Sequence, residues 1–199
     1  MIKCGKKRKK IEIYFSPETI NTIKNESEKS PRTETGGILL GRRFDFDSRV
    51  MIIVYATSGP GPRAFKTPIA FAPDIDHYNG LLIDGKKRLG LDYLGEWHKH
   101  PAGFEGTSLA DLDQVKKILA EEDRDFMVCP IVFEKTKRKA ASGGAKPNAR
   151  RLDFGRFAIN VFYFSRGSKT VKIIPPKAIH RNSAVYRKLV GKNINADEF

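Results

Sequence analysis

Residues 95–101 read Gly-Glu-Trp-His-Lys-His-Pro and lie near the middle of the chain. His98 and His100 are two residues apart, at the end of an apolar stretch that begins near Leu89. In a β-strand the side chains of residues i and i+2 point to the same face, so both imidazoles can reach one metal ion. The sequence therefore predicts a strand over residues 89–100 that ends in a metal site.

Asp111 is the best third ligand near this pair. It lies three residues after Ser108, at the start of a stretch, 108–122, whose apolar residues recur at helical spacing. Three protein ligands and one open position are typical of a catalytic zinc site, whereas a structural zinc is usually held by four. Cys4 and Cys129 do not suggest a structural site, because neither has a partner at zinc-finger spacing.

Ser108 and Asp111 also have a purely structural interpretation. A serine at a helix N-cap with an acidic residue three positions later resembles a capping box, and taken alone the pattern would indicate only a helix start. The two histidines close upstream favour a second role for each residue. Asp111 then binds the metal, and Ser108 both caps the helix and donates to a developing oxyanion.

A hydrolytic metal site also needs a general base that does not bind the metal. Four acidic residues are candidates for this role, namely Glu34, Glu96, Glu105 and Asp113. The strand period does not exclude Glu96, which is in phase with His98. Glu34 is modestly preferred, because it begins a predicted strand beside two glycines, where a polar side chain can emerge over a site.

Hydrophobic periodicity predicts the surrounding elements. Strands and helices mix without strict alternation, which favours an α+β or α/β architecture with one mixed sheet and helices on its faces. Two of the strands pair as a hairpin through a turn at 45–48. The predicted strands are 11–15, 33–41, 49–57, 63–71 (at an edge, because of Pro68), 89–100, 126–133, 157–164 and 169–174, with Pro175-Pro176 as a stop. The predicted helices are 16–29, one that begins at Pro73-Asp74, 108–122 and a terminal one at 179–190.

The 199 residues are 40% hydrophobic, enough to bury a core. We expect a single domain with its core at about 11–174, a basic N-terminal tail, a flexible basic insertion at about 135–150 and a C-terminal extension at about 175–199. No stretch approaches the roughly 18 apolar residues of a membrane-spanning helix, and no apolar segment follows the basic N-terminus as in a secretory signal. The two cysteines have no evident partner, as in a reducing compartment. Together these features predict a cytoplasmic protein without membrane contact.

The formal net charge is +14, and the basic excess gathers in residues 3–10, 135–151 and 181–192. Basic clusters attract nucleic acid or acidic protein surfaces, but they also occur as solvated tails without a specific partner. No aromatic residues interleave with the lysines in the first two clusters, as they would in a single-strand binding groove. The composition leaves both interpretations open.

Glu34, the His98-Lys99-His100 triplet, seven intervening residues and Ser108-x-x-Asp111 together resemble the full JAMM signature of the JAB/MPN metalloprotease family. The flanking residues are similar too, with a Gly-Gly-apolar-Leu-Gly strand after the glutamate, a tryptophan before the first histidine and a proline after the second. The resemblance extends over about 11–133. Lys99 departs from it, since many members carry Ser or Thr there; we expect its side chain to point away from the metal and to affect surface contacts more than chemistry.

Within this family, the Ser-Gly-Pro-Gly-Pro-Arg loop at 58–63 and the Phe-Ala-Pro-Asp segment at 71–74 are most similar to prokaryotic JAB proteins. Several of those accompany ubiquitin-activating-like and ubiquitin-conjugating-like enzymes in bacterial operons, some of them linked to phage defence. The resemblance implies a deaminase-like fold and one Zn²⁺ per chain on His98, His100 and Asp111. It further implies Glu34 as the general base and Ser108 as the oxyanion donor.

The activity that the resemblance implies is that of a zinc isopeptidase or peptidase. It would deconjugate or process a ubiquitin-like protein at its C-terminal tail, with the E1-like and E2-like enzymes of the same system as further partners. Two alternatives stay open. The net charge motivates a nucleic-acid-associated protein in which the JAB fold is only a scaffold, and the enzyme could instead cleave a sulfur-carrier precursor or a small peptide.

Overall fold

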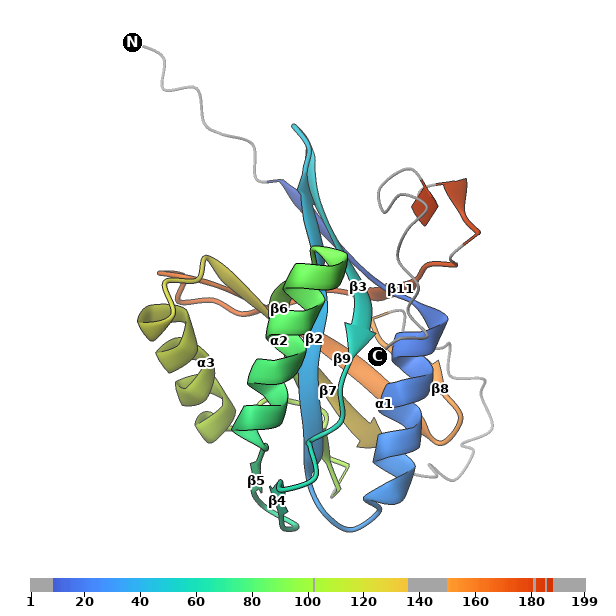
Figure 1. Cartoon of the computed structure of the whole chain (residues 1–199), viewed down its shortest axis with the longest axis vertical. Coiled ribbons are helices and arrows are strands. Elements are labelled where there is room, and N and C mark those ends of the chain that lie inside the picture. Colours follow the sequence, from blue (N-terminus) through green and yellow to red (C-terminus); the bar gives the residue numbers. More distant parts are fainter. Residues whose placement is uncertain (1–8, 102, 136–149, 181, 185, 188–199) are drawn as a thin grey trace, which may run out of the picture.

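The computed structural model describes residues 9–101, 103–135, 150–180, 182–184 and 186–187, and it has a mixed α+β architecture built on one large sheet (Figure 1). Three helices pack on this sheet in the described part of the chain: α1 (Pro17–Lys29), α2 (Ile75–Leu89) and α3 (Leu109–Glu121). The strands of the large sheet are β1 (Lys10–Phe15), β2 (Thr35–Asp45), β3 (Arg49–Thr57), β6 (Asp92–His100), β7 (Phe126–Glu134), β8 (Leu152–Phe154), β9 (Phe157–Ser165), β10 (Lys172–Ile173) and β11 (Pro176–Ala178). Strands β4 (Phe65–Lys66) and β5 (Phe71–Ala72) form a separate small hairpin.

The strand order of the large sheet is β10-β9-β7-β6-β2-β3-β1-β11, and β8 pairs with β9. The interior strand β6 ends at the two histidines, and it pairs antiparallel with β2 and parallel with β7. The predicted hairpin of 33–41 and 49–57 is confirmed, because β2 and β3 pair antiparallel around the turn at 46–48. The predicted mixed sheet with helices on its faces is therefore confirmed.

Helices cover both faces of the sheet. On one face Ile23 of α1 belongs to the same buried cluster as Trp97 of β6. On the other face Tyr78 of α2 and Val115 of α3 pack on the residues that alternate with that cluster along the strands. Because successive strand residues point to opposite faces, His98 lies on the face that α2 and α3 cover.

The predicted helix starts are confirmed by their caps. Ser16 accepts a hydrogen bond from the Thr19 N–H at 3.1 Å, and Asp74 accepts one from the His77 N–H at 3.3 Å. Gly90 ends α2 in the left-handed conformation, with φ of 61°, which glycine adopts without a steric penalty. These local signals explain why all three helices begin where the sequence indicates.

The predicted edge strand over 63–71 is wrong. Residues 65–72 instead form the β4–β5 hairpin, apart from the large sheet, with Pro68 in its turn. The Thr67 N–H donates to the Ala70 carbonyl at 2.8 Å, which closes this turn. Proline has no N–H for a sheet ladder, so a turn satisfies this stretch better than a continuous strand.

The chain after β9 also differs from the prediction. The last predicted strand shortens to β10, and Pro176 does not stop the sheet but begins β11, which pairs parallel with β1. A proline is tolerated there because β11 is an edge strand. The predicted helix at 179–190 lies partly outside the described residues. Within them, residues 184, 186 and 187 are helical, and the Arg187 N–H donates to the Ser183 carbonyl at 3.0 Å.

Other predictions fall mostly on residues outside the described part. These are the basic tail at 1–8, almost all of the 135–150 insertion, which joins β7 to β8, and the end of the C-terminal extension. Among the helices of the described residues, none is both long and apolar enough to cross a membrane.

Candidate metal centre

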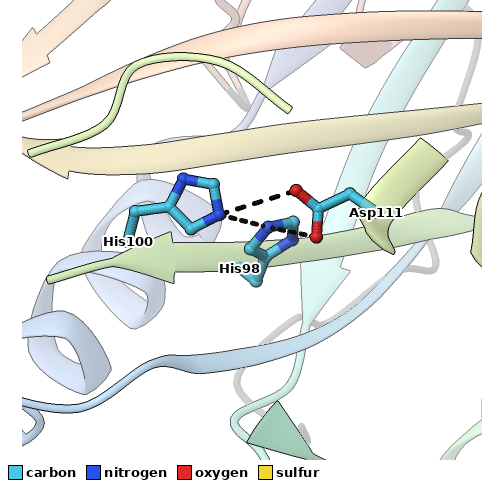
Figure 2. A group of neighbouring side chains, drawn as sticks. All are labelled: His98, His100 and Asp111. Atoms are coloured by element: carbon cyan, nitrogen blue, oxygen red, sulfur yellow. Dashed lines mark hydrogen bonds and ion pairs between the residues drawn. The ribbon is translucent and has the colours of Figure 1, made fainter. Parts of the chain in front are cut away.

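His98 and His100 point to the same face at the end of β6 (Figure 2). Their Nε2 atoms are 2.9 Å apart. The Nδ1 atom of His100 lies 3.1 Å from the Phe104 carbonyl oxygen, so this nitrogen donates and Nε2 is left with its lone pair. A hydrogen bond of this kind orients a ligating imidazole.

Asp111 reaches the same point from the first turn of α3. Its Oδ1 lies 3.3 Å from the Nε2 of His98, and its Oδ2 lies 3.6 Å from the Nε2 of His100. Its Oδ2 also accepts a hydrogen bond from the Ser108 N–H at 2.6 Å, and the Ser108 hydroxyl accepts one from the Asp111 N–H at 3.1 Å. The capping-box interpretation of this pair is confirmed, and the box holds the Asp111 carboxylate beside the histidines. The second role of each residue, in metal binding and in oxyanion stabilisation, stays a prediction.

The three side chains form a group that could hold a metal ion, since their donor atoms all lie within 4.8 Å of one another. Ligands about 2.0–2.1 Å from a tetrahedral zinc are roughly 3.3 Å apart, which is close to the separations observed here. Burial acts to raise the pKa of Asp111, but hydrogen bonds with His100 and His98 outweigh it and hold this pKa well below its usual range. Asp111 is therefore a carboxylate at neutral pH, as a metal ligand must be.

Glu34 lies on the same side as the histidines. In the β2–β6 pair Gly36 is the partner of His98, and strand alternation places Glu34 on the face of Gly36. Glu34, His98 and Asp111 line one pocket. Burial raises the pKa of Glu34, while the nearby His100 and His98 act in the opposite direction. A half-buried carboxyl with a raised pKa is suited to accept and return a proton.

The other candidate bases are engaged elsewhere or face solvent. Glu96 lines the same pocket, but it accepts hydrogen bonds from the Tyr93 hydroxyl at 3.1 Å and from the Gln114 amide at 3.2 Å. Glu105 lies 3.8 Å from Arg151, and Asp113 is exposed beside Lys116. The geometry thus favours Glu34 as the general base, and its assignment stays a prediction.

The loop at 58–63 supports the site from its far side. The Trp97 indole donates to the Ser58 carbonyl at 3.0 Å, and Arg63 pairs with Asp74, the N-cap of α2, at 3.1 Å. The segment between β5 and α2 is thereby held in place. Pro73 of this segment and Phe71 of β5 line the pocket with Glu34. The sequence pattern at 71–74 did not indicate that Phe71 and Pro73 line this pocket.

The prediction for Lys99 is half right. Its side chain points away from the histidines, as strand alternation requires, but it makes no surface contact because it is 0% exposed. Its ammonium group donates to the carbonyl oxygens of Ser30 at 2.7 Å and of Thr33 at 3.3 Å. The reason is the packing of the loop between α1 and β2 over this face of the sheet, which a strand pattern alone does not reveal.

Comparisons with known proteins add two findings. The chain is 34% identical over 113 residues to a curated protein named CD-NTase/cGAS isopeptidase, from Enterobacter hormaechei subsp. hoffmannii (strain UCI 50), and the match covers 56% of this chain. The chain spans 60% of that relative's length. It also matches the solution structure of protein DSY2949 from Desulfitobacterium hafniense, with a TM-score of 0.54, 18% identity, and coverage of 86% of this chain and 94% of that one. At this identity the likeness concerns the fold alone. No model of a protein family matches the chain.

Proposed function

We propose that this chain is a zinc-dependent isopeptidase of the JAB/MPN type with the deaminase-like fold of that family. The observation that carries the proposal is the convergence of His98, His100 and Asp111 on one point, with Glu34 on the same face and Ser108 at the adjoining helix start. The relative named as an isopeptidase supports the type of reaction. A set of three ligands with a neighbouring carboxyl is what metal-assisted amide hydrolysis requires.

Each of the site residues has its own role in the proposed reaction. Zinc, when bound by His98, His100 and Asp111, supplies the Lewis acidity that polarises an amide carbonyl and makes water a stronger acid. A Glu34 carboxylate oxygen takes one proton from the attacking water and delivers it to the leaving amine nitrogen as the C–N bond breaks. The Ser108 hydroxyl donates a hydrogen bond to the carbonyl oxygen as negative charge develops on it.

The proposed substrate is the C-terminal tail of a ubiquitin-like protein joined through an amide to a lysine of its target. The relative's name refers to CD-NTase/cGAS, so we propose that this chain acts in a bacterial conjugation system of the anti-phage type, with its E1-like and E2-like enzymes as partners. We expect the extended tail to add main-chain hydrogen bonds at an exposed strand edge beside the site. A precursor extension or a small peptide would use the same chemistry.

The test is hydrolysis of three matched substrates: a ubiquitin-like protein linked to a lysine side chain, the same protein with a short C-terminal extension, and the tail peptide alone. We expect the zinc-loaded protein to cleave the isopeptide-linked substrate fastest. Glu34→Gln should keep one zinc and lose about 10²–10⁴-fold in turnover, because a carboxamide cannot accept the proton. Glu105→Gln is the matched control and should cleave at the normal rate.

Two results would contradict the proposal. Near-normal turnover in Glu34→Gln removes this residue from the role of base. A well-folded protein with one bound zinc that cleaves none of the three substrates argues against an isopeptidase.

A further inference from the structure

Lys99 lies between the two histidines in sequence but on the opposite face of β6, and its ammonium binds the backbone of a distant segment. It donates to the Ser30 carbonyl at 2.7 Å and to the Thr33 carbonyl at 3.3 Å. Ser30 is the C-cap of α1, and Thr33 directly precedes Glu34. One buried side chain therefore binds both ends of the turn that leads into the proposed general base.

A second set of polar contacts holds the same segment to α1. Glu26 accepts hydrogen bonds from the hydroxyls of Thr35 at 2.8 Å and Ser30 at 3.2 Å. Lys66 of β4 also reaches this cluster, 3.0 Å from the Ser30 hydroxyl and 3.4 Å from Glu26. These contacts join side chains to side chains. The two Lys99 contacts differ from them because they fix main-chain carbonyls to the strand that carries the metal ligands.

We propose that Lys99 is a positioning residue for Glu34: it ties segment 30–34 to β6 and so sets where the Glu34 carboxylate lies relative to His98, His100 and Asp111. This inference rests on the proposed function and names a further residue that serves it. The Lys99 side chain lies on the face of β6 opposite the histidines, so its hydrogen bonds act on the site through the segment that they hold.

The chemistry of the side chain explains why a lysine suits this place. Its long stem spans the distance from β6 to the loop carbonyls, which a serine or threonine hydroxyl could not cover. An ammonium makes charge-assisted hydrogen bonds, which are stronger than neutral ones, and a buried ammonium without acceptors would be costly. Misplacing a reacting group by about 1 Å can lower a rate by about 10²-fold, so a loose segment 30–34 would be seen in turnover.

Lys99→Met is the main test, because methionine keeps an unbranched apolar stem and removes the donors. We expect kcat to fall by about 10- to 100-fold while KM changes less than about 3-fold and zinc stays at one per chain. Backbone amide exchange in residues 32–35 should become faster. Lys66→Met is the matched control, since it removes an ammonium from the same cluster without touching the two carbonyls, and it should keep kcat within about 3-fold.

A double-mutant cycle separates positioning from general destabilisation. The cycle is measured in single turnovers with excess enzyme. When Glu34→Gln is already present, adding Lys99→Met should lower the cleavage rate little further, because there is no base left to misplace. Lys99→Gln keeps a hydrogen-bond donor, so it should change amide exchange and kcat less than Lys99→Met does. If Lys99→Met prevents folding, Lys99→Gln replaces it in each of these experiments.

The inference is overturned if Lys99→Met lowers the rate equally with and without the Glu34 carboxylate, or if amide exchange in residues 32–35 is unchanged. The amide-exchange measurement tests whether Lys99 holds this segment, and it does so whether or not the protein is an active isopeptidase. Failure of the wild type to cleave any conjugate would reject the proposed function separately, and with it the catalytic part of this inference.

Discussion

Gly36 and His98 are cross-strand partners, and a Cβ atom added to Gly36 would lie 3.2 Å from the Cβ of His98. The same Cβ would lie 2.5 Å from the Trp97 carbonyl oxygen and 2.9 Å from the Phe71 ring. At position 36, β2 approaches β6 and Phe71 so closely that only a residue without a side chain fits. This close approach brings the proposed base and the metal ligands onto one side of the sheet.

Gly36→Ala should weaken both the fold and the metal site. The added methyl group must push on backbone and on His98, so we expect a loss of about 1–3 kcal/mol in the free energy of unfolding. Zinc affinity should fall at least about tenfold, since the ligand geometry tolerates little displacement. Thermal melts and a competitive zinc titration measure the two effects.

Gly80→Ala is the control for this substitution. No heavy atom lies within 4 Å of a Cβ added at Gly80, which is inside α2, so alanine should stabilise the helix by about 0.5–1 kcal/mol. Wild-type zinc affinity in Gly36→Ala would show that β2 can move away without disturbing His98.

Metal binding should stabilise the protein in proportion to its affinity. Zinc at about 100 times its dissociation constant contributes about 2.7 kcal/mol, which raises the melting temperature of a chain of this size by about 5–10 °C. His100→Ala should bind little zinc and show no such rise, and Glu34→Gln should behave as the wild type. Zinc content per chain and melts with and without chelator provide the measurement. An equal response of His100→Ala to zinc would place the metal elsewhere.

Ser108→Ala tests both the capping role of Ser108 and its proposed role as an oxyanion donor. The helix cap that Ser108 provides to the Asp111 N–H is worth about 1 kcal/mol, and an oxyanion donor is worth about 10²–10³-fold in kcat. We expect both losses in Ser108→Ala and neither in Ser108→Thr, because threonine keeps the hydroxyl. Ser16→Ala, which removes the cap of α1 far from the ligands, should lose stability but not rate. Should Ser108→Ala keep its kcat, the hydroxyl serves only as a cap.

Glu12 should make stability depend on pH. Its carboxylate accepts a hydrogen bond from Lys177 of β11 at 2.7 Å and lies 3.1 Å from Lys10, and these contacts lower its pKa below the usual 4.5. A lowered pKa contributes stability above pH 4.5, and the contribution is lost as the pH falls through the pKa of the folded state. Glu12→Gln should cost about 1–2 kcal/mol at pH 7, and its difference from the wild type should shrink below pH 4.5. A difference that stays constant down to pH 3 would mean that the ion pair contributes nothing.

Local sequence patterns predicted much of the secondary structure. The three helices begin at the capping residues that the sequence indicates, and the strand that ends at His100 follows from its apolar run. The failures lie in segments that contain proline. Pro68 is in the turn of a detached hairpin, and Pro176 opens a strand that pairs with Ile13. No periodicity in the segment itself carries that information.

The sequence by itself determined the candidate metal ligands, because residues two apart in a strand and an acid in the next helix turn are brought together by local geometry. Only the tertiary structure decided the surroundings of those ligands. The carbonyl that accepts the hydrogen bond from Lys99 is 69 residues away, and Gly36 matters because of a strand that follows it by more than fifty residues. Contacts at such separations depend on how the layers pack, and the physical reason is that burial and hydrogen-bond partners are properties of the assembled core.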